Sequence, residues 1–299
     1  MAEFGRIAIL GLGLIGGSLA KALKEKNAVR EVVGWGHRAP SLQTGVQLGV
    51  IDRYSLDLAD AVKGAEVVVI ATPTLIAERM IEQLVPLIDA ATIITDVASV
   101  KGNLLRAAQR AFGKEPANLV LAHPIAGSEQ SGIVAAKADL FINHRVILTP
   151  TENTSKAALD RIEQMWKITG AELSRLSVDD HDTILAATSH LPHIAAFALV
   201  DALAGDPAQR EIFKYAAGGF RDFTRIASSD PTMWRDIALA NSAALLNAID
   251  QFSEHLMRLR AAIAAGDGDA IFATFTRAKQ ARDRFAELLR QRETNPSDE

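Results

Sequence analysis

The glycine-rich stretch at residues 11–17 constrains the fold of this chain more than any other feature. Its sequence is Gly-Leu-Gly-Leu-Ile-Gly-Gly, with an apolar run before it at residues 7–10 and a helix-forming segment after it at residues 18–24. A short buried strand, a G-x-G-x-x-G turn and a helix in this order form the fingerprint of a dinucleotide-binding fold. The simpler alternative is a glycine-rich turn between a strand and a helix that binds no ligand.

Each glycine of the motif has its own physical role. Gly11 permits the tight turn, Gly13 lets the backbone approach a pyrophosphate, and Gly16 allows the helix to pack closely on the strand. The phosphates then lie at the helix N-terminus, where unpaired N–H groups and the helix dipole favour negative charge. We therefore predict that Leu14 and Ile15, which lie between these glycines, belong to the same cofactor site.

Apolar, β-branched runs alternate with helical segments through the first half of the chain. This βαβ pattern predicts an α/β fold with a Rossmann-type, doubly wound parallel sheet whose strands are buried on both faces. The expected strands lie at residues 7–10, 31–34, 67–71, 92–95, 119–122 and 146–148. We expect helices between them, for example at residues 75–88 and 101–112, and a closing helix–strand pair at residues 155–169 and 171–176.

The strand pattern stops near Val178, and the rest of the chain is predicted to be helical. The expected helical segments are residues 178–203, a broken segment at 209–217, a long run at 231–265 and a last helix to about residue 290 after a turn at 266–269. A helix of about 35 residues is about 50 Å long, which exceeds a small domain, so part of it is expected to pack on a second subunit. We predict a dinucleotide-binding domain at residues 1–176 and an all-helical substrate and dimerisation domain at residues 177–299.

The composition narrows the class of protein. A chain of 299 residues with 48% apolar and 23% charged residues is typical of a soluble globular protein. The net charge of -4 provides no basic surface for nucleic acid, and the absence of cysteine excludes disulfides and thiolate chemistry. No apolar run reaches the roughly 18 residues of a membrane span and no signal peptide is visible, so we predict a cytoplasmic protein without a membrane or metal partner.

The end of the second predicted strand bears on the choice of cofactor. NAD-binding domains carry a carboxylate there, about 20 residues beyond the glycines, which binds the ribose 2′-hydroxyl. In this chain Gly36 occupies that place and is followed by His37 and Arg38. We therefore favour NADP over NAD, with Arg38 pairing with the 2′-phosphate, although a solvated loop is the competing interpretation. Thr72 and Pro73, after the third predicted strand, are also assigned to the cofactor site.

Two polar stretches follow neighbouring strands of the predicted sheet. Residues 96–102, with Ser99, follow the fourth strand, and residues 123–129, with His123, follow the fifth. Ligands bind beyond the carboxyl ends of the strands in open α/β sheets, so both stretches are expected to face the nicotinamide crevice. His123 there can take a proton as a hydride leaves, and Ser99 can orient it or the substrate. The alternatives are a helix N-cap for Ser99 and a packed loop residue for His123.

The helical half contributes two further candidate regions. Pro192 lies inside a predicted helix and should bend it, which presents His193 or His190 to a cleft, although His190 can equally be a core histidine. Residues 218–227 are glycine-led and cationic, and we expect them to be irregular. Arginine suits bidentate capture of a carboxylate, so Arg225 is a candidate ligand; a surface loop with solvated charges is the alternative.

Five ordered blocks resemble the prephenate/arogenate dehydrogenase family of tyrosine biosynthesis over nearly the whole chain. The blocks are GLGLIGGSLA, TDVASVKG, AHPIAGSEQSG, ATSHLPH and GGFRDFTRIASSDPTMWRDI. The resemblance implies a Rossmann domain joined to a helical domain that forms an intertwined dimer. It also implies roles for particular residues: His123 as the catalytic acceptor with Ser99 beside it, Arg225 on a substrate carboxylate, His193 with Ser128 or Glu129 on the substrate side, and Asp222 in fixing the arginine segment.

The implied activity is the oxidative decarboxylation of prephenate, arogenate or both, with hydride transfer to a nicotinamide. Family members that use NAD carry Asp where this chain has Gly36, which puts NAD preference in doubt. Two alternatives stay open. A 3-hydroxyacid-type dehydrogenase of similar plan would be expected to have a catalytic lysine in the helical domain, and residues 178–203 contain none. A nucleotide-sensing protein without turnover would bind the cofactor and oxidise no cyclohexadienol.

Overall fold

The computed structural model describes residues 2–127, 130–205 and 212–294. Contacts between residues divide the chain into two units, Met1–Leu245 and Leu246–Glu299, and each is described by itself. The predicted boundary between residues 176 and 177 falls inside the first unit and remains a prediction.

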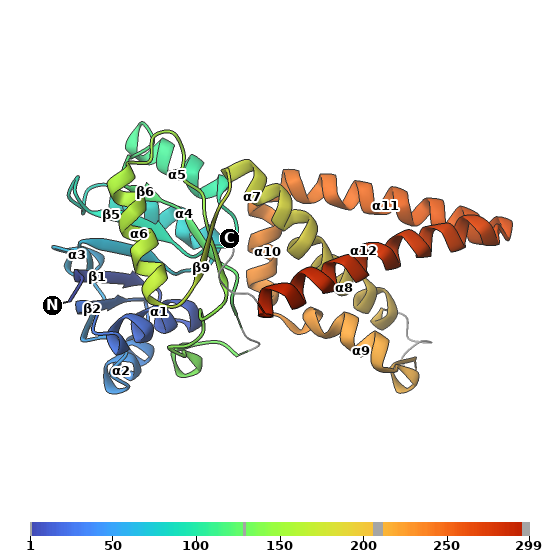
Figure 1. Ribbon diagram of the computed structural model, residues 1–299. Helices are drawn as coiled ribbons and strands as arrows, with labels where there is room; N and C mark the ends of the chain where they lie inside the picture. Colours follow the sequence, from blue (N-terminus) through green and yellow to red (C-terminus); the bar gives the residue numbers. More distant parts are fainter. Residues whose placement is uncertain (1, 128–129, 206–211, 295–299) are drawn as a thin grey trace. The chain divides into compact units, whose positions relative to one another are not determined.

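The first unit contains a six-stranded sheet in which every paired strand is parallel (Figure 1). Its order is β3-β2-β1-β4-β5-β6, so the chain changes direction across the sheet between β1 and β4. The strands are β1 Phe4–Leu10, β2 Val29–Trp35, β3 Arg53–Ser55, β4 Val67–Ile70, β5 Ile93–Asp96 and β6 Leu119–Val120. A reversal of this kind is the topological switch point at which doubly wound folds bind ligands. The predicted Rossmann-type fold class is confirmed.

The strand register brings the carboxyl ends of four strands to one edge. Leu10 is opposite Trp35 on one side and Ile70 on the other, and Ile70 is opposite Asp96. The loops that leave these four residues therefore start side by side, and each of them contains residues that the sequence assigned to the site. This edge of the sheet positions the candidate site.

Helices cover both faces of the sheet because side chains alternate along each strand. On β1, Ile7 and Ile9 belong to one core cluster and Ala8 and Leu10 to the other. The first cluster is completed by α1 Leu14–Glu25, α2 Ala39–Gln47 and α6 Lys156–Ile168, and the second by α3 Leu58–Val62, α4 Thr74–Leu84 and α5 Gly102–Phe112. Strands buried on both faces explain why the sequence showed continuous apolar runs there.

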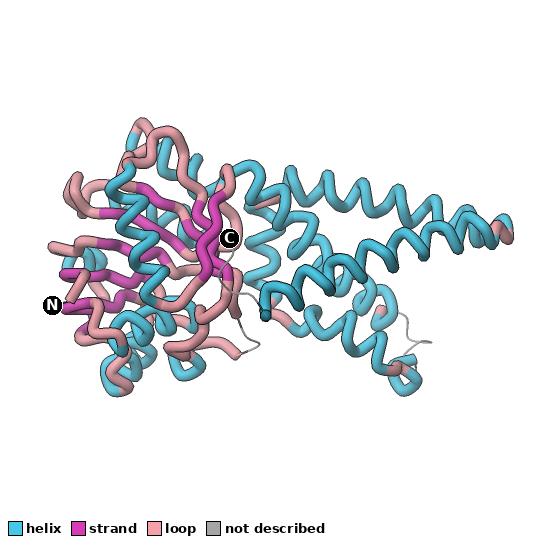
Figure 2. The backbone as a smooth tube through the Cα atoms, in the orientation of Figure 1, coloured by secondary structure: helices cyan, strands magenta, loops and turns pink. Residues whose placement is uncertain are grey.

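A second, three-stranded sheet lies beside the first (Figure 2). It contains β7 Ala122–Pro124, β8 Arg145–Leu148 and β9 Glu172–Arg175, with β7 antiparallel to β8 and β8 parallel to β9. The prediction of one parallel sheet that includes residues 146–148 is therefore wrong, as is a single strand over 119–122. The reason lies at Ala122, whose N–H donates to Asp96 and whose carbonyl accepts from Lys101, so side chains replace a neighbouring strand there.

The strand β3 was not predicted. It has only three residues, Arg53–Ser55, and its side chains are half-buried. It lies at the edge of the sheet, where a short polar segment is usual.

The helical part of the first unit begins with one long, interrupted helix. It runs as α7 Val178–Leu185, a π-helical turn at Ala186–His190 and α8 Leu191–Ala204. The predicted disturbance at Pro192 takes this form, because proline cannot donate a backbone bond and the wider turn before it accommodates the ring. The segment then packs back on the Rossmann part, with α7 against α5.

The stretch that was expected to be irregular is helical instead. Residues Gly218–Thr224 form α9 and Arg225–Ser228 form a 3-10 turn, and Ile212–Tyr215 before them form another. The two glycines lie in the first turn of α9, where they cost the helix least, which explains the error. Residues 209–211 of the predicted broken segment lie outside the described residues.

The long helix predicted at 231–265 is also two helices. These are α10 Pro231–Ala240 and α11 Ser242–Ala265, and Asn241 breaks them with φ -109° and ψ 29°. The predicted start is confirmed, since the Asp230 carboxylate accepts the Met233 N–H at 2.8 Å. The break has a cause within the unit, because the Asn241 amide is bound by Asp182 and His190.

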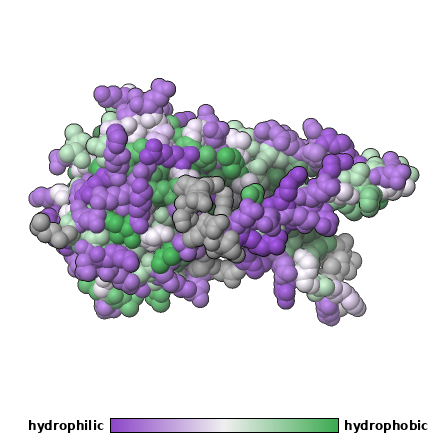
Figure 3. Space-filling view, viewed as in Figure 1, coloured by the Kyte–Doolittle hydropathy of each residue, from purple (hydrophilic) through white to green (hydrophobic). Residues whose placement is uncertain are grey.

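The second unit is a helical hairpin. It consists of α11 from Leu246 onward and α12 Gly268–Thr294, joined at Gly266 with φ +67°. Ten large apolar side chains are exposed along it, among hydrophilic ones (Figure 3): Leu246, Phe252, Leu256, Met257, Ile263, Phe272, Phe275, Phe285, Leu288 and Leu289. So many exposed apolar side chains indicate a surface that another chain covers.

One helical stretch among the described residues, Val178–Ala204, is long and apolar enough to cross a membrane. The criterion concerns only length and composition, and the stretch is interrupted by the π-helical turn and contains two fully buried histidines. Only 22% of its most apolar window is buried within the structure, and the prediction of no membrane partner remains a prediction.

Candidate active site

The glycine loop after β1 has the shape that a phosphate group needs. Gly11 has φ +106°, and an added Cβ there would lie 2.5 Å from the Ala71 carbonyl oxygen. A Cβ on Gly16 would lie 2.4 Å from the Gly11 carbonyl oxygen, so both positions exclude any side chain. A Cβ on Gly13 would meet nothing within 4 Å. Open space therefore faces the start of α1, and an anion fits it.

The first turn of α1 has no side-chain cap. Gly13 is its N-cap residue, and Leu14 and Ile15 begin the helix half-buried. The backbone N–H groups of a first turn have no partner within their own helix, so a bound pyrophosphate would satisfy them. These residues fit the dinucleotide that the motif predicted.

The end of β2 carries no acidic side chain. Gly36 is half-buried, and a Cβ there would meet only the side chain of Leu42, at 3.7–4.0 Å. His37 and Arg38 are exposed, and the His37 ring contacts Trp35 edge-on with centroids 4.8 Å apart. The room at Gly36 means that packing does not dictate glycine here.

The end of β4 leads to Thr72 and Pro73. The Thr72 hydroxyl is buried and has no hydrogen-bond partner among the described residues, and Pro73 precedes α4 as its N-cap residue. A buried hydroxyl without a partner at the carboxyl edge of the sheet is a group that a bound ligand can satisfy.

The loop after β5 is held by a buried ion pair. Asp96 and Lys101 are both buried, and the Lys101 ammonium donates to the Asp96 carboxylate and, at 2.7 Å, to the Ala122 carbonyl. Burial raises the pKa of Asp96 and lowers the pKa of Lys101, while the charge of each partner opposes the shift in the other. Asp96 also accepts the N–H groups of Ala98 at 2.8 Å and Ala122 at 3.1 Å. Ser99 lies half-buried in this fixed loop.

The helix-cap alternative for Ser99 does not hold. The N-cap residue of α5 is Lys101 and not Ser99. The first N–H groups of α5 are bound by Asp182, which is far away in the sequence. Asp182 accepts the N–H of Lys101 at 2.9 Å and that of Gly102 at 2.8 Å. A carboxylate at this end of a helix is favourable, because it satisfies free donors and complements the helix dipole.

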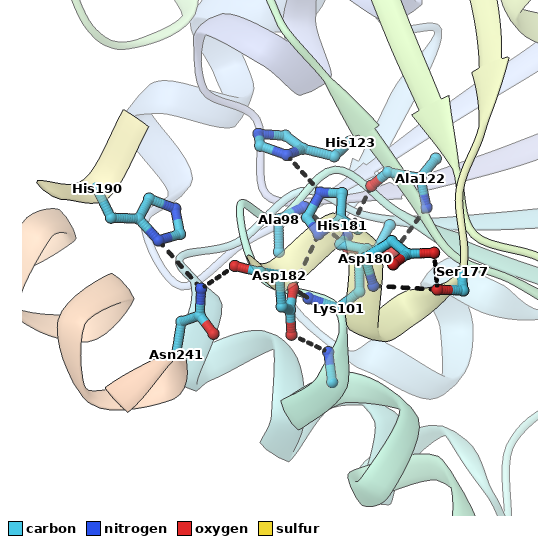
Figure 4. Close-up of polar contacts among 12 residues, drawn as sticks. Ala98, Lys101, Ala122, His123, Ser177, Asp180, His181, Asp182, His190 and Asn241 are labelled. Carbon is cyan, nitrogen blue, oxygen red and sulfur yellow. Dashed lines mark hydrogen bonds and ion pairs between the residues drawn. The ribbon is translucent and has the colours of Figure 1, made fainter. Parts of the chain in front are cut away.

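His123 lies on β7 in a chain of hydrogen bonds (Figure 4). Its Nδ1 lies 2.9 Å from Nε2 of His181, and Nδ1 of His181 lies 2.8 Å from Oδ1 of Asp182. His123 is 9% exposed and His181 is 0% exposed. Neither His181 nor Asp182 was predicted, because both lie in the acidic run at residues 179–182, which has the composition of an ordinary solvated helix start.

Burial, assisted by the charges around it, keeps His123 neutral. Burial, followed by the nearby His181, Lys101 and His190, holds the pKa of His123 well below its usual value of 6.5. Burial alone would raise the pKa of Asp182, but hydrogen bonds from His181 and from the backbone of Lys101 and Gly102 lower it. The site therefore combines a neutral imidazole with an ionised carboxylate two groups away.

His190 is buried beside this chain. Its Nδ1 accepts from the Asn241 amide nitrogen at 3.2 Å, and its Nε2 has no partner among the described residues. Burial lowers the pKa of His190 to about 4. The core-residue interpretation of His190 thus fits its burial, while its unpartnered nitrogen leaves a hydrogen bond to be made.

His193 stacks on a tryptophan, and its pKa responds to the charge of Arg225. The His193 ring stacks on Trp234 with centroids 3.6 Å apart, and its Nδ1 donates to the Ser189 carbonyl at 3.0 Å. Burial and then the positive charge of Arg225 lower the pKa of His193. Electrostatic interactions therefore join His123 to His190, His190 to His193, and His193 to Arg225.

The structure gives little information on the remaining predicted substrate residues, because one is exposed and the others lie outside the described residues. Asp222 lies on α9, where its carboxylate pairs with Arg221 at 3.1 Å, and the two side chains are 71% and 79% exposed. Ser128 and Glu129 lie outside the described residues. No group of three or more His, Cys, Asp or Glu that could hold a metal occurs in the part of the chain that the structure describes.

Comparison with known proteins decides the family. The model of the prephenate dehydrogenase nucleotide-binding domain matches residues 19–175, and that of the prephenate dehydrogenase dimerization domain matches residues 177–277. The chain belongs to the prephenate dehydrogenase family. The second match supports oligomerisation, in agreement with the exposed apolar side chains of the hairpin.

Similar proteins in this family align with nearly the whole chain. A cyclohexadienyl dehydrogenase of Zymomonas mobilis is 36% identical, with 94% of this chain and 96% of the relative aligned. A prephenate dehydrogenase of Bacillus subtilis is 37% identical, over 97% of this chain and 78% of the relative. A crystal structure of Aquifex aeolicus prephenate dehydrogenase with hydroxyphenyl propionate and NAD+ has a TM-score of 0.87 at 33% identity, covering 95% and 99% of the two chains.

The matches to prephenate dehydrogenases argue against both alternatives, the 3-hydroxyacid-type dehydrogenase and the nucleotide-sensing protein. The 3-hydroxyacid-type reading required a lysine base in the helical segment, whereas the buried Lys101 belongs to the loop after β5 and is bound by Asp96. A nicotinamide cofactor is supported by the nucleotide-binding family model and by the NAD+ complex of the Aquifex relative.

Proposed function

We propose that this chain catalyses the oxidative decarboxylation of prephenate, arogenate or both, as a step of tyrosine biosynthesis, with His123 as the general base. The observation that carries the proposal is the buried, neutral His123 on β7, directly after Ala122, whose N–H binds Asp96 at the carboxyl end of β5. Relatives with both kinds of name support the two substrates, including a Synechocystis arogenate dehydrogenase with a TM-score of 0.80 at 28% identity.

In this reaction the protein takes up one proton and positions the substrate. A nicotinamide held at the glycine loop would supply the acceptor for the hydride that leaves C4 of the substrate ring. His123 takes the proton of the C4 hydroxyl, and the ring carboxylate leaves as carbon dioxide while its bonding electrons complete the aromatic ring. Because aromatisation provides the driving force, the protein mainly positions the substrate and stabilises charge. A base whose pKa lies below neutral is free to accept that proton at physiological pH.

The cofactor is assigned to the edge of the sheet. We expect the pyrophosphate at Gly11, Gly13 and Gly16, with Leu14 and Ile15 providing backbone N–H groups, and the nicotinamide near Thr72, Pro73 and Ser99. We favour NADP over NAD, because the end of β2 has no carboxylate to repel a 2′-phosphate and has His37 and Arg38 exposed beside it.

The substrate is assigned to the helical side. We expect Arg225 to bind a substrate carboxylate, because an arginine fork matches a carboxylate in two hydrogen bonds. The charge of Arg225 acts on His193, which supports a common site for the two. Ser128, Glu129 and Asp222 are proposed to complete this side, Ser99 to contact both ligands, and the enzyme to act as a cytoplasmic homodimer with the domain boundary at residue 176.

One assay tests the proposal. The purified protein is given prephenate and arogenate, each with NAD and NADP, and the absorbance of the reduced cofactor is followed. We expect turnover with at least one substrate and a higher kcat/KM with NADP. Cofactor binding without oxidation of either compound would support the sensor alternative and refute the proposed activity.

A further inference from the structure

The row formed by His123, His181 and Asp182 has a fixed order of donors and acceptors. An ionised carboxylate can only accept hydrogen bonds, so the 2.8 Å contact with Oδ1 of Asp182 places a proton on Nδ1 of His181. A neutral His181 then has a bare Nε2, which can only accept. The 2.9 Å contact therefore places a proton on Nδ1 of His123, and Nε2 of His123 keeps its lone pair.

The charged and titratable groups around His123, His181 and Asp182 have other hydrogen-bond partners, so they do not change the order of donors and acceptors. Lys101 is bound to Asp96 and to the Ala122 carbonyl, and His190 is bound to Asn241. These are the charged and titratable groups whose electrostatic effect reaches His123 and His181, together with Asp182 itself. The proton order along the row is therefore set by Asp182.

We propose that His181 and Asp182 are positioning residues which hold His123 as the Nδ1–H tautomer and so make Nε2 the atom that takes up the substrate proton. The catalytic part of this inference rests on the proposed function, whereas the tautomer is a property of the protein without ligands.

The row also stabilises the product of proton transfer. When Nε2 of His123 accepts the hydroxyl proton, the ring becomes a cation that donates through Nδ1 to His181, with the Asp182 charge beyond it. No second proton has to move. The neutral His181 ring separates the Asp182 carboxylate from His123. This arrangement sets the tautomer of His123, but it does not raise the pKa of His123 as a directly bound carboxylate would. Serine protease triads use a carboxylate to hold a histidine tautomer in the same sense.

Asp182 is itself fixed by the loop that carries Ser99. Its two oxygens accept the backbone N–H groups of Lys101 and Gly102 at the start of α5. These hydrogen bonds tie the orientation of His123 to the loop after β5.

Nitrogen NMR of the protein labelled with ¹⁵N-histidine tests the tautomer directly. The His123 signals are assigned by their loss in His123→Asn. We expect Nδ1 of His123 and Nδ1 of His181 to be protonated in the ligand-free protein at neutral pH. In Asp182→Asn, we expect this order to be lost in both rings, and kcat to fall by about 10²–10⁴-fold with KM changed little.

Two further variants separate positioning from general structure. His181→Gln keeps one acceptor and one donor, so it should retain more activity than His181→Leu and keep the proton on Nδ1 of His123. His144→Gln changes an exposed histidine and should leave tautomer and kcat unchanged.

The outcomes are distinct. A proton on Nε2 of ligand-free His123, or the same tautomer in His181→Leu with full activity, would overturn the inference even if the protein oxidises its substrate. The expected tautomer without turnover of either substrate would instead contradict the proposed function and leave the positioning role standing. If Asp182→Asn fails to fold, the comparison of His181→Gln with His181→Leu decides the question.

Discussion

The surroundings of His123 and those of Arg225 differ in how completely one chain builds them. His123, His181 and Asp182 form a buried row whose members are tied to β7, α7 and the start of α5. Arg225 lies on an exposed turn after α9, and neither that turn nor α9 has a buried residue. The base side of the site is thus rigid within one chain. The arginine side, in contrast, lies on elements that are largely exposed.

The largest effect is expected at the base. His123→Asn should lower kcat by about 10²–10⁴-fold, the usual contribution of acid–base catalysis, because asparagine cannot take up the proton. The Kd of the nicotinamide dinucleotide should be nearly unchanged, since the glycine loop is not altered. Steady-state kinetics and cofactor titration measure both, and near-normal turnover would remove His123 from the proposed role.

The buried ion pair should dominate the stability of the base side. Lys101→Met leaves the Asp96 charge buried without its partner, and losses of this kind cost about 3–5 kcal/mol of unfolding free energy. Lys156→Met is the matched control, because Lys156 forms an exposed pair with Asp160 that should matter by less than about 0.5 kcal/mol. Denaturant unfolding compares them, and equal losses would show that burial of the pair does not matter.

The arginine side should affect binding rather than stability. Arg225→Ala should raise KM by at least about 10- to 100-fold, because one hydrogen bond between charged groups already accounts for this range and the arginine fork makes two, with unfolding free energy nearly unchanged. Arg175→Ala is the matched control, because it removes an exposed arginine of β9 that pairs with Glu163, and neither residue is assigned to the site, so KM should change little. An unchanged KM in Arg225→Ala would exclude Arg225 from the carboxylate site.

The smallest expected effect concerns the cofactor. Gly36→Asp adds a carboxylate where a Cβ has room, so it should lower the preference for NADP over NAD by about 10-fold, which is about 1.4 kcal/mol. Gly36→Ala adds the Cβ without the charge and should leave the ratio unchanged. Titration of each variant with NADP and NAD gives the ratio of the two Kd values. If this ratio does not change in Gly36→Asp, the 2′-phosphate binds elsewhere.

The sequence predicted the Rossmann part and the start of α10 well because their signals are local. The glycine loop, the apolar strands and the Asp230 cap each depend on residues near in the chain, and the structure has them. The second sheet could not be predicted, because it arises where Asp96 and Lys101 bind the backbone of Ala122. The break at Asn241 has a cause of the same kind, a hydrogen bond to residue 182.

In the candidate site, too, residues with local sequence signals were predicted, whereas residues brought in by long-range contacts were not. His123 was predicted because it directly follows the apolar run at residues 119–122, and the fold places ligands beyond the ends of such runs, although the structure has His123 within β7. His181 and Asp182 were not, because their role comes from a helix that packs on α5 and brings them to His123 and to the N–H groups of Lys101 and Gly102. Spacing along the chain contains no sign of such a contact.

The pH dependence of kcat/KM tests most directly the claim that a neutral, buried histidine is the base. Protonation of His123 abolishes its activity as a base, and its pKa lies well below 6.5 because of burial. The profile should therefore stay flat as the pH falls from about 8 to about 6 and decline only in more acidic solution, and that acidic decline should be absent from the residual activity of His123→Asn. A decline with its midpoint at or above 6.5, or one that persists in His123→Asn, would contradict the account.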